Sequence, residues 1–148
     1  MKKSLARLAA LLVLGVLALL TVSSLAQAAA LSPADEKAVR VVVQAQLTAF
    51  ARDDADKAFS FAAPNVREAV GSASSFLAMV RRSYPVVYRP ASLAFLKPEG
   101  QNDQAVQRVQ MLDASGESWL AVYSLQRQKN KSWRITGCAV LANKGRMA

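Results

Sequence analysis

The chain has 148 residues, one cysteine and no histidine, and its formal net charge at pH 7 is +9. A single cysteine excludes an intramolecular disulfide. The missing histidine excludes Ser-His-Asp and Cys-His catalytic groups and removes the commonest zinc ligand. We expect no metal and no cofactor, and the sequence points to no catalytic residue.

Residues 1–30 have the layout of a secretory signal peptide. Lys2, Lys3 and Arg7 form a basic start, and residues 8–22 form an uninterrupted apolar run. Small side chains follow, so cleavage after Ala28 or Ala30 is expected, with the released chain starting near residue 31. The alternative is an uncleaved anchor, because about 20 apolar residues can span a bilayer.

Cleavage after residue 30 leaves 118 residues with a net charge of +6, enough for one domain. We expect that domain at 31–142 and a loose tail at 143–148. Nucleic acid is not an expected partner of an exported, periplasmic or secreted protein. The basic charge favours an anionic ligand of the cell envelope.

Helices are predicted in the first half of the domain. Ser32 and Pro33 start a long helix, in which Val39, Val43, Leu47 and Phe50 form one apolar stripe. Asp53-Asp54 caps a short second helix that ends before Pro64, and residues 65–70 form a further turn closed by Gly71. Ser74-Ser75 caps a segment with apolar residues at 76, 77 and 80, which ends at Tyr84-Pro85.

The second half shows the two-residue period of strands. Residues 92–95 alternate, and a second strand passes through Val106 and Val109. Trp119, Ala121, Tyr123 and Leu125 share one face of a third, and Trp133, Ile135, Gly137, Ala139 and Leu141 share one face of the last. Turns are predicted at 97–103, 113–117 and 129–132.

Two places break the strand pattern, and we expect a bulge or sharp bend in at least one of them. Val106 and Val109 break the alternation of the second strand, and Gly137 interrupts the last. In the unbroken pattern Cys138 lies on the face opposite Trp133 and Ile135. A lone buried thiol is usually a small apolar group, so Cys138 is not expected to be a nucleophile.

Helices followed by antiparallel strands predict the α+β class. Residues 44–50, 53–54, 58–59 and 132–137, in this order, resemble the nuclear transport factor 2-like superfamily. That resemblance implies N-terminal helices packed on a curved antiparallel sheet of about four strands, a cone. More narrowly, residues 76–85, 88–90, 106–109 and 133–138 are similar to a bacterial family known as domain of unknown function 4864, which implies a fold without an activity.

The stretch 81–89 is the most distinctive candidate site, because three guanidinium groups and two phenols fall within nine residues. If Arg81, Arg82, Tyr84, Tyr88 and Arg89 converged, they would hold a carboxylate or phosphate beside an aromatic wall. The alternative is structural, with the arginines offsetting a helix dipole and the tyrosines packed under the sheet.

A catalytic alternative starts from the superfamily resemblance, which implies a pocket between helices and sheet. Isomerases of that kind use a tyrosine and carboxyl groups. The carboxylates nearest the tyrosines here are Asp103, Asp113 and Glu117, which fall in predicted turns where carboxylates usually cap or face solvent.

These observations favour an exported, non-enzymatic binding or interaction domain of the cell envelope, with a homodimer through the exposed sheet face as a further expectation. The first alternative is a small lyase or isomerase with Tyr/Asp acid-base chemistry in the pocket. The second is a membrane-anchored accessory protein, if the signal is not cleaved. A buried Tyr–Asp pair in the pocket would favour the enzyme, and a pocket filled by Phe, Trp and Leu would favour the interaction domain.

Overall fold

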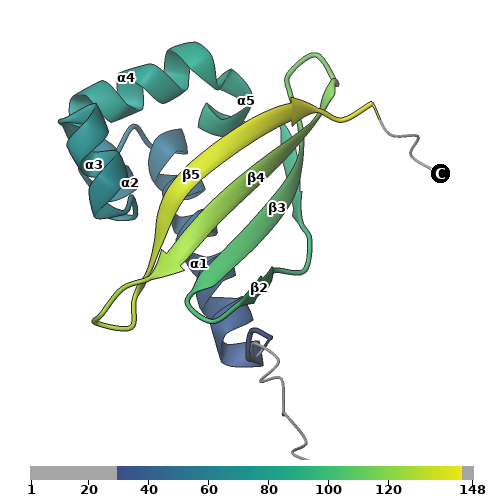
Figure 1. Ribbon diagram of the computed structural model, residues 1–148. Helices are drawn as coiled ribbons and strands as arrows, with labels where there is room; N and C mark the ends of the chain where they lie inside the picture. Colours follow the sequence, from purple (N-terminus) through teal and green to yellow (C-terminus); the bar gives the residue numbers. More distant parts are fainter. Residues whose placement is uncertain (1–29, 145–148) are drawn as a thin grey trace, which may run out of the picture.

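The structure, a computed structural model, describes residues 30–144 (Figure 1). Within these residues five helices precede five strands. The helices are α1 (Pro33–Ala51), α2 (Ala55–Ser60), α3 (Pro64–Val70), α4 (Ala73–Ser83) and α5 (Pro85–Tyr88), and the strands are β1 (Ser92–Phe95), β2 (Glu99–Gln101), β3 (Gln104–Leu112), β4 (Ser118–Arg127) and β5 (Trp133–Ala142). The fold is α+β, as the sequence predicted.

The two ends of the chain lie partly outside this description. Residues 1–29, which contain most of the predicted signal and the cleavage candidate Ala28, are outside the described residues, as are residues 145–148 of the predicted tail. Ala30 forms an isolated antiparallel bridge with Gln101, and the Asn143 N–H donates to the Ser118 carbonyl at 2.9 Å. No helix between residues 30 and 144 is long and apolar enough to cross a membrane.

The sheet is antiparallel and has the order β1-β3-β4-β5, with β2 also paired to β3. β1 pairs with the C-terminal half of β3 and β2 with its start, so the two short strands share one edge of β3. β2 was not predicted, because its residues fall in the predicted turn 97–103. Its approach to β3 requires Gly100, where a Cβ would lie 2.2 Å from the Gln104 carbonyl oxygen.

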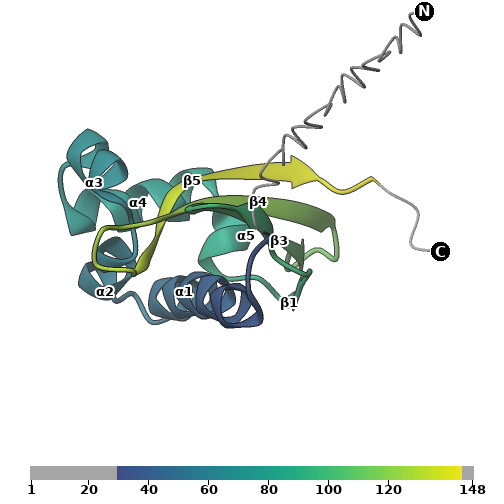
Figure 2. The same ribbon diagram turned by 60° about the horizontal axis from the view of Figure 1, so that its bottom comes forward.

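Helix α1 lies against one face of the sheet, and α2 to α5 form an arc that starts at the end of α1 (Figures 1 and 2). The predicted stripe of α1 is confirmed, since Val39, Val43, Leu47 and Phe50 are all buried. These side chains occupy the core between α1 and the inner face of the sheet. Helix and sheet therefore form two layers around one apolar core.

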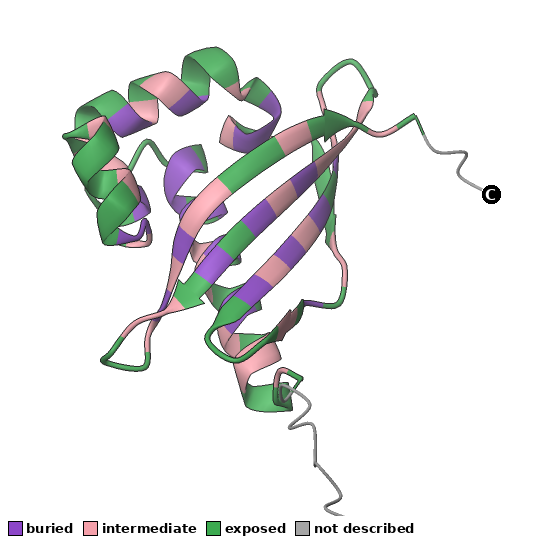
Figure 3. Ribbon diagram, in the orientation of Figure 1, coloured by how far each residue is buried: buried purple, intermediate pink, exposed green. Residues whose placement is uncertain are grey.

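The strands β3 and β4 alternate between buried inner residues and more exposed outer ones (Figure 3). Trp119, Ala121, Tyr123 and Leu125 share the inner face, as predicted. In β3 the register is regular and no bulge occurs. Its pattern looked broken because a buried inner position is occupied by Gln107, while Val106 points to the outer face.

The predicted bulge is confirmed in β5, and it corrects the predicted faces of that strand. The β4–β5 register shifts between Ser124 and Leu125, because Thr136 is an extra residue between Ile135 and Gly137. After an extra residue every side chain changes face. Cys138 and Val140 therefore join Trp133 and Ile135 on the inner face, whereas Ala139 and Leu141 face outward.

Two local predictions on the helices also differ from the structure. The N-cap of α4 is Ser72, whose hydroxyl accepts from the Ser75 N–H at 3.2 Å, and not Ser74-Ser75, which lie within the first turn. No helix was predicted after Tyr84, but Pro85 starts the short helix α5. Proline is favoured at the first position of a helix, where its missing N–H costs nothing.

Candidate functional site

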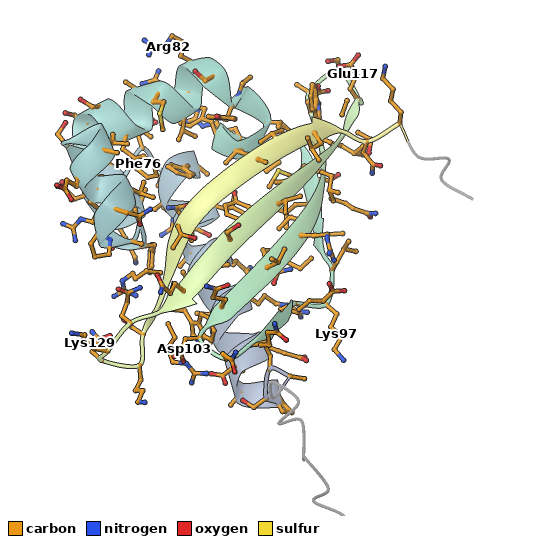
Figure 4. The ribbon with its side chains drawn as sticks, in the orientation of Figure 1. Phe76, Arg82, Lys97, Asp103, Glu117 and Lys129 are labelled. Atoms are coloured by element: carbon orange, nitrogen blue, oxygen red, sulfur yellow. The ribbon has the colours of Figure 1, made fainter. Side chains whose placement is uncertain are left out.

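A cavity of about 190 Å³ lies between the arc of helices and the inner face of β4 and β5. Phe50 comes from α1, Phe76 and Val80 from α4, and Val87 from α5. The Phe76 ring packs 5.5 Å from the Phe50 ring, centroid to centroid, and its side chain lies inside the arc of helices in Figure 4. This wall is apolar, so water gains few hydrogen bonds inside the cavity.

Four side chains in the lining carry polar atoms, and none of them is charged: Gln46, Tyr84, Tyr123 and Cys138. Gln46 is buried on the face of α1 that carries the apolar stripe, and its Nε2 donates to the Ala58 carbonyl at 3.1 Å. A glutamine among valines and phenylalanines of an apolar stripe is a sequence signal for a polar spot in the core. No prediction was drawn from that signal.

Tyr123 is the most unusual of these residues. Its side chain is only 1% exposed, and its hydroxyl has no hydrogen-bond partner among the described residues. Burial raises the pKa of this phenol well above its ordinary value of 10.0, and the neighbouring Cys138 thiol adds to the shift. The hydroxyl therefore stays protonated at neutral pH and retains an unused donor.

Cys138 lies opposite Tyr123 on the neighbouring strand. The residue is accessible to solvent, but its thiol lines the cavity, so protein atoms surround much of it. Burial raises the pKa of the thiol to about 12, against a smaller lowering by Tyr123. Cys138 is thus a neutral, weakly polar part of the cavity wall at pH 7.

The structure divides the arginine- and tyrosine-rich stretch 81–89 among three places. Tyr84 lines the cavity, and Tyr84 and Arg89 together line a surface recess of about 280 Å³ beside Trp119. Arg81 and Arg89 stack over the Tyr88 ring, at 5.3 and 4.7 Å from its centroid. Arg82 is exposed and points away from the sheet (Figure 4).

Asp53 completes the cluster around Tyr88. The Tyr88 hydroxyl donates to one oxygen of this carboxylate, and Arg89 lies 3.1 Å from the other. The hydrogen bond to Asp53 is the largest cause that raises the pKa of Tyr88. Asp53 lies 35 positions before Tyr88, and no local pattern pointed to their contact. The guanidinium group of Arg89 is therefore already paired within the chain.

The three carboxylates considered for catalysis do not line the cavity. Asp103 and Glu117 lie at opposite ends of the sheet (Figure 4). Asp103 pairs with Arg127 at 3.2 Å. Asp113 organises the β3–β4 turn, where it accepts hydrogen bonds from Ser115, Glu117 and the Trp119 indole. The hydrogen bond from Trp119 is the main cause that lowers the pKa of Asp113.

Metal ligands do not gather between residues 30 and 144: no group of three or more cysteine, aspartate or glutamate side chains could hold an ion there. What the fold does define is an α+β domain with an uncharged, mainly apolar cavity that is partly open to solvent. The chain belongs to the family described as domain of unknown function (DUF4864), whose model matches residues 32–148. No curated protein and no solved structure matches the chain.

Proposed function

We propose that this domain binds a small, uncharged and mainly apolar molecule in the cavity between helices and sheet. The observation that carries the proposal is a cavity of about 190 Å³ whose lining includes Tyr123, a residue with a buried and unpaired hydroxyl. A dry apolar cavity of about 150 Å³ is large enough to bind benzene. The cavity here accommodates a monocyclic molecule of about nine non-hydrogen atoms.

The lack of charged side chains in the lining argues against an ionic ligand. Burial of an ion without a partner costs far more than burial of a neutral polar group, and the lining supplies neither arginine, lysine nor carboxylate. The same observation disfavours the lyase or isomerase alternative, which needs a carboxylate facing a tyrosine inside the cavity. The Tyr88–Asp53 contact lies outside it, at the surface.

Binding is tested with three probes of nine non-hydrogen atoms each: acetophenone, α-methylstyrene and benzoate. We expect amide NMR shifts at residues around the cavity with the two uncharged probes, and at least tenfold weaker binding of benzoate. Equal binding of benzoate, or no binding of either uncharged probe, would contradict the proposal.

A matched pair of variants locates the binding. Cys138→Leu places a larger side chain in the cavity, and we expect at least fivefold weaker binding of both uncharged probes. Ala139→Leu adds similar bulk at the next residue, which is exposed on the outer face, and should leave binding unchanged. Equal effects of the two substitutions would place the probes elsewhere.

We also propose that the protein is exported and processed. Support comes from the basic residues Lys2, Lys3 and Arg7, the apolar run 8–22 and the small residues at 26–30. Intact mass spectrometry of the protein from the envelope fraction of its host should give a chain that starts at residue 29 or 31. A full-length mass retained in the membrane would favour the anchored accessory protein instead.

The relation to nuclear transport factor 2-like cones is likewise a proposal. It is supported by a long helix, α1, that lies along the inner face of an antiparallel sheet (Figure 2), and by the bulge that redirects β5. In such an arrangement the end of the sheet not covered by α1 leaves room for a pocket under α4 and α5, where the cavity is found.

A further inference from the structure

We propose that the ligand of the cavity carries an uncharged hydrogen-bond acceptor, such as a ketone, ester or amide oxygen, which accepts the hydroxyl proton of Tyr123. This inference rests on the proposed function and specifies the chemical class of the ligand. It starts from an unpaired hydroxyl in the wall of the cavity. Buried polar groups in proteins are nearly always hydrogen-bonded, so we expect a ligand to supply a partner for this unpaired hydroxyl.

The protein itself does not supply that partner. Among the polar side chains of the lining, Gln46 uses its amide nitrogen on the Ala58 carbonyl. Cys138 is directly opposite Tyr123, but its sulfur is only a weak acceptor. The contact between the Cys138 thiol and the Tyr123 phenol shifts the pKa of both groups, but it lacks the geometry of a full hydrogen bond. The strong acceptor must therefore come from the occupant of the cavity.

The position of the hydroxyl is fixed by the sheet. Tyr123 lies in the central part of β4, with Gln107 of β3 and Cys138 of β5 as its direct neighbours. Strand pairing on both sides leaves its backbone little freedom, so the donor is already oriented before a ligand binds. A preoriented donor strengthens binding because little ordering remains to be done when the ligand enters.

An acceptor with a negative charge does not fit this place. A carboxylate or phosphate would require a cation or several strong donors for its charge, and beside the paired amide of Gln46 the lining offers only the Tyr84 and Tyr123 hydroxyls and the weakly polar Cys138 thiol. A neutral carbonyl needs only one good donor. The remainder of the ligand meets the apolar wall of Phe50, Phe76 and Val80.

Acetophenone and α-methylstyrene provide the test, since they differ only in a carbonyl oxygen that replaces a methylene group. In the wild-type protein we expect acetophenone to bind about tenfold more tightly, the effect of one buried hydrogen bond. Tyr123→Phe should abolish this preference by weakening acetophenone alone. Tyr88→Phe, at a tyrosine outside the lining of the cavity, should preserve it.

A spectroscopic measurement on the wild-type protein keeps the test valid if Tyr123→Phe fails to fold. The carbonyl ¹³C resonance of bound, labelled acetophenone should lie downfield of its position in an apolar solvent, because the carbonyl accepts a hydrogen bond. Equal binding of both probes with no such shift would overturn this inference and leave the proposed function intact. Failure of both probes to bind would overturn the proposed function itself. A bound water that remains on Tyr123 beside acetophenone would also refute the inference.

Discussion

At the scale of a single residue, the reactivity of the Cys138 thiol is a measure of the environment of the cavity. Its pKa is raised by burial to about 12, from an ordinary value of 9.0. Only the thiolate reacts with disulfide-type reagents. Because Cys138 is the only cysteine, any thiol modification reports on this one position.

The rate of Cys138 modification by the small neutral reagent methyl methanethiolsulfonate should therefore rise about tenfold per pH unit from pH 7 to pH 10, without levelling off. The protein unfolded in urea should level off near pH 9 instead, since its thiol has an ordinary pKa. A plateau near pH 9 in the folded protein would show that the thiol faces bulk water. Saturating acetophenone should slow the reaction of the folded form.

At the scale of elements, most of the secondary structure can be predicted from the sequence. The stripe of α1 is a run of valine, leucine and phenylalanine at helical spacing, and its burial follows directly from that spacing. The last three strands alternate clearly because one face packs on helices and the other does not. Gly71 closes α3 with a φ of 91°, which glycine adopts without strain.

The faces of β5 show where periodicity reaches its limit. Gly137 indicated an irregularity, but the sequence does not specify how many residues a bulge inserts. The single extra residue, Thr136, moves Cys138 from the outer to the inner face. One residue of register thus decides whether the thiol lines the cavity or faces solvent, and the pairing with β4 that sets this register is not encoded in the alternation of β5 itself.

The candidate site depends even more on tertiary contacts. The sequence shows that residues 81–89 are rich in arginine and tyrosine. It does not show that Tyr84 faces the cavity while Tyr88 and Arg89 contact Asp53, because this depends on α5, and four residues are too few to show a helical period. The cavity joins residues from α1, α4, β4 and β5. Its polar member Tyr123 looked in sequence like any other inner aromatic residue of a strand.

At the scale of the whole molecule, Asp35 joins the start of α1 to the far end of the chain. Its carboxylate accepts from the Arg127 guanidinium at 3.1 Å and from the Trp133 indole at 3.3 Å. The Arg127 guanidinium also stacks 4.9 Å from the centre of the Trp133 ring system. These contacts span 92 and 98 positions, so they form only when helix layer and sheet layer have assembled.

The pH dependence of stability follows from the same carboxylate. Burial acts to raise the pKa of Asp35, but hydrogen bonds from Ser32 and Trp133 and the charge of Arg127 outweigh it, so the pKa lies below its ordinary value of 3.8. A lowered pKa in the folded state stabilises the fold above the unfolded pKa. This contribution is lost as the pH falls through the folded pKa.

We therefore expect Asp35→Asn to lower the free energy of unfolding by about 1–2 kcal/mol at pH 7, measured by urea denaturation. The difference from wild type should shrink as the pH falls below about 4, where the wild-type carboxyl also becomes neutral. Asp103→Asn is the control, since this carboxylate also contacts Arg127 but is 72% exposed; its loss should cost less than about 0.5 kcal/mol. A difference for Asp35→Asn that stayed constant down to pH 3 would show that shape, and not charge, makes Asp35 hold the two layers together.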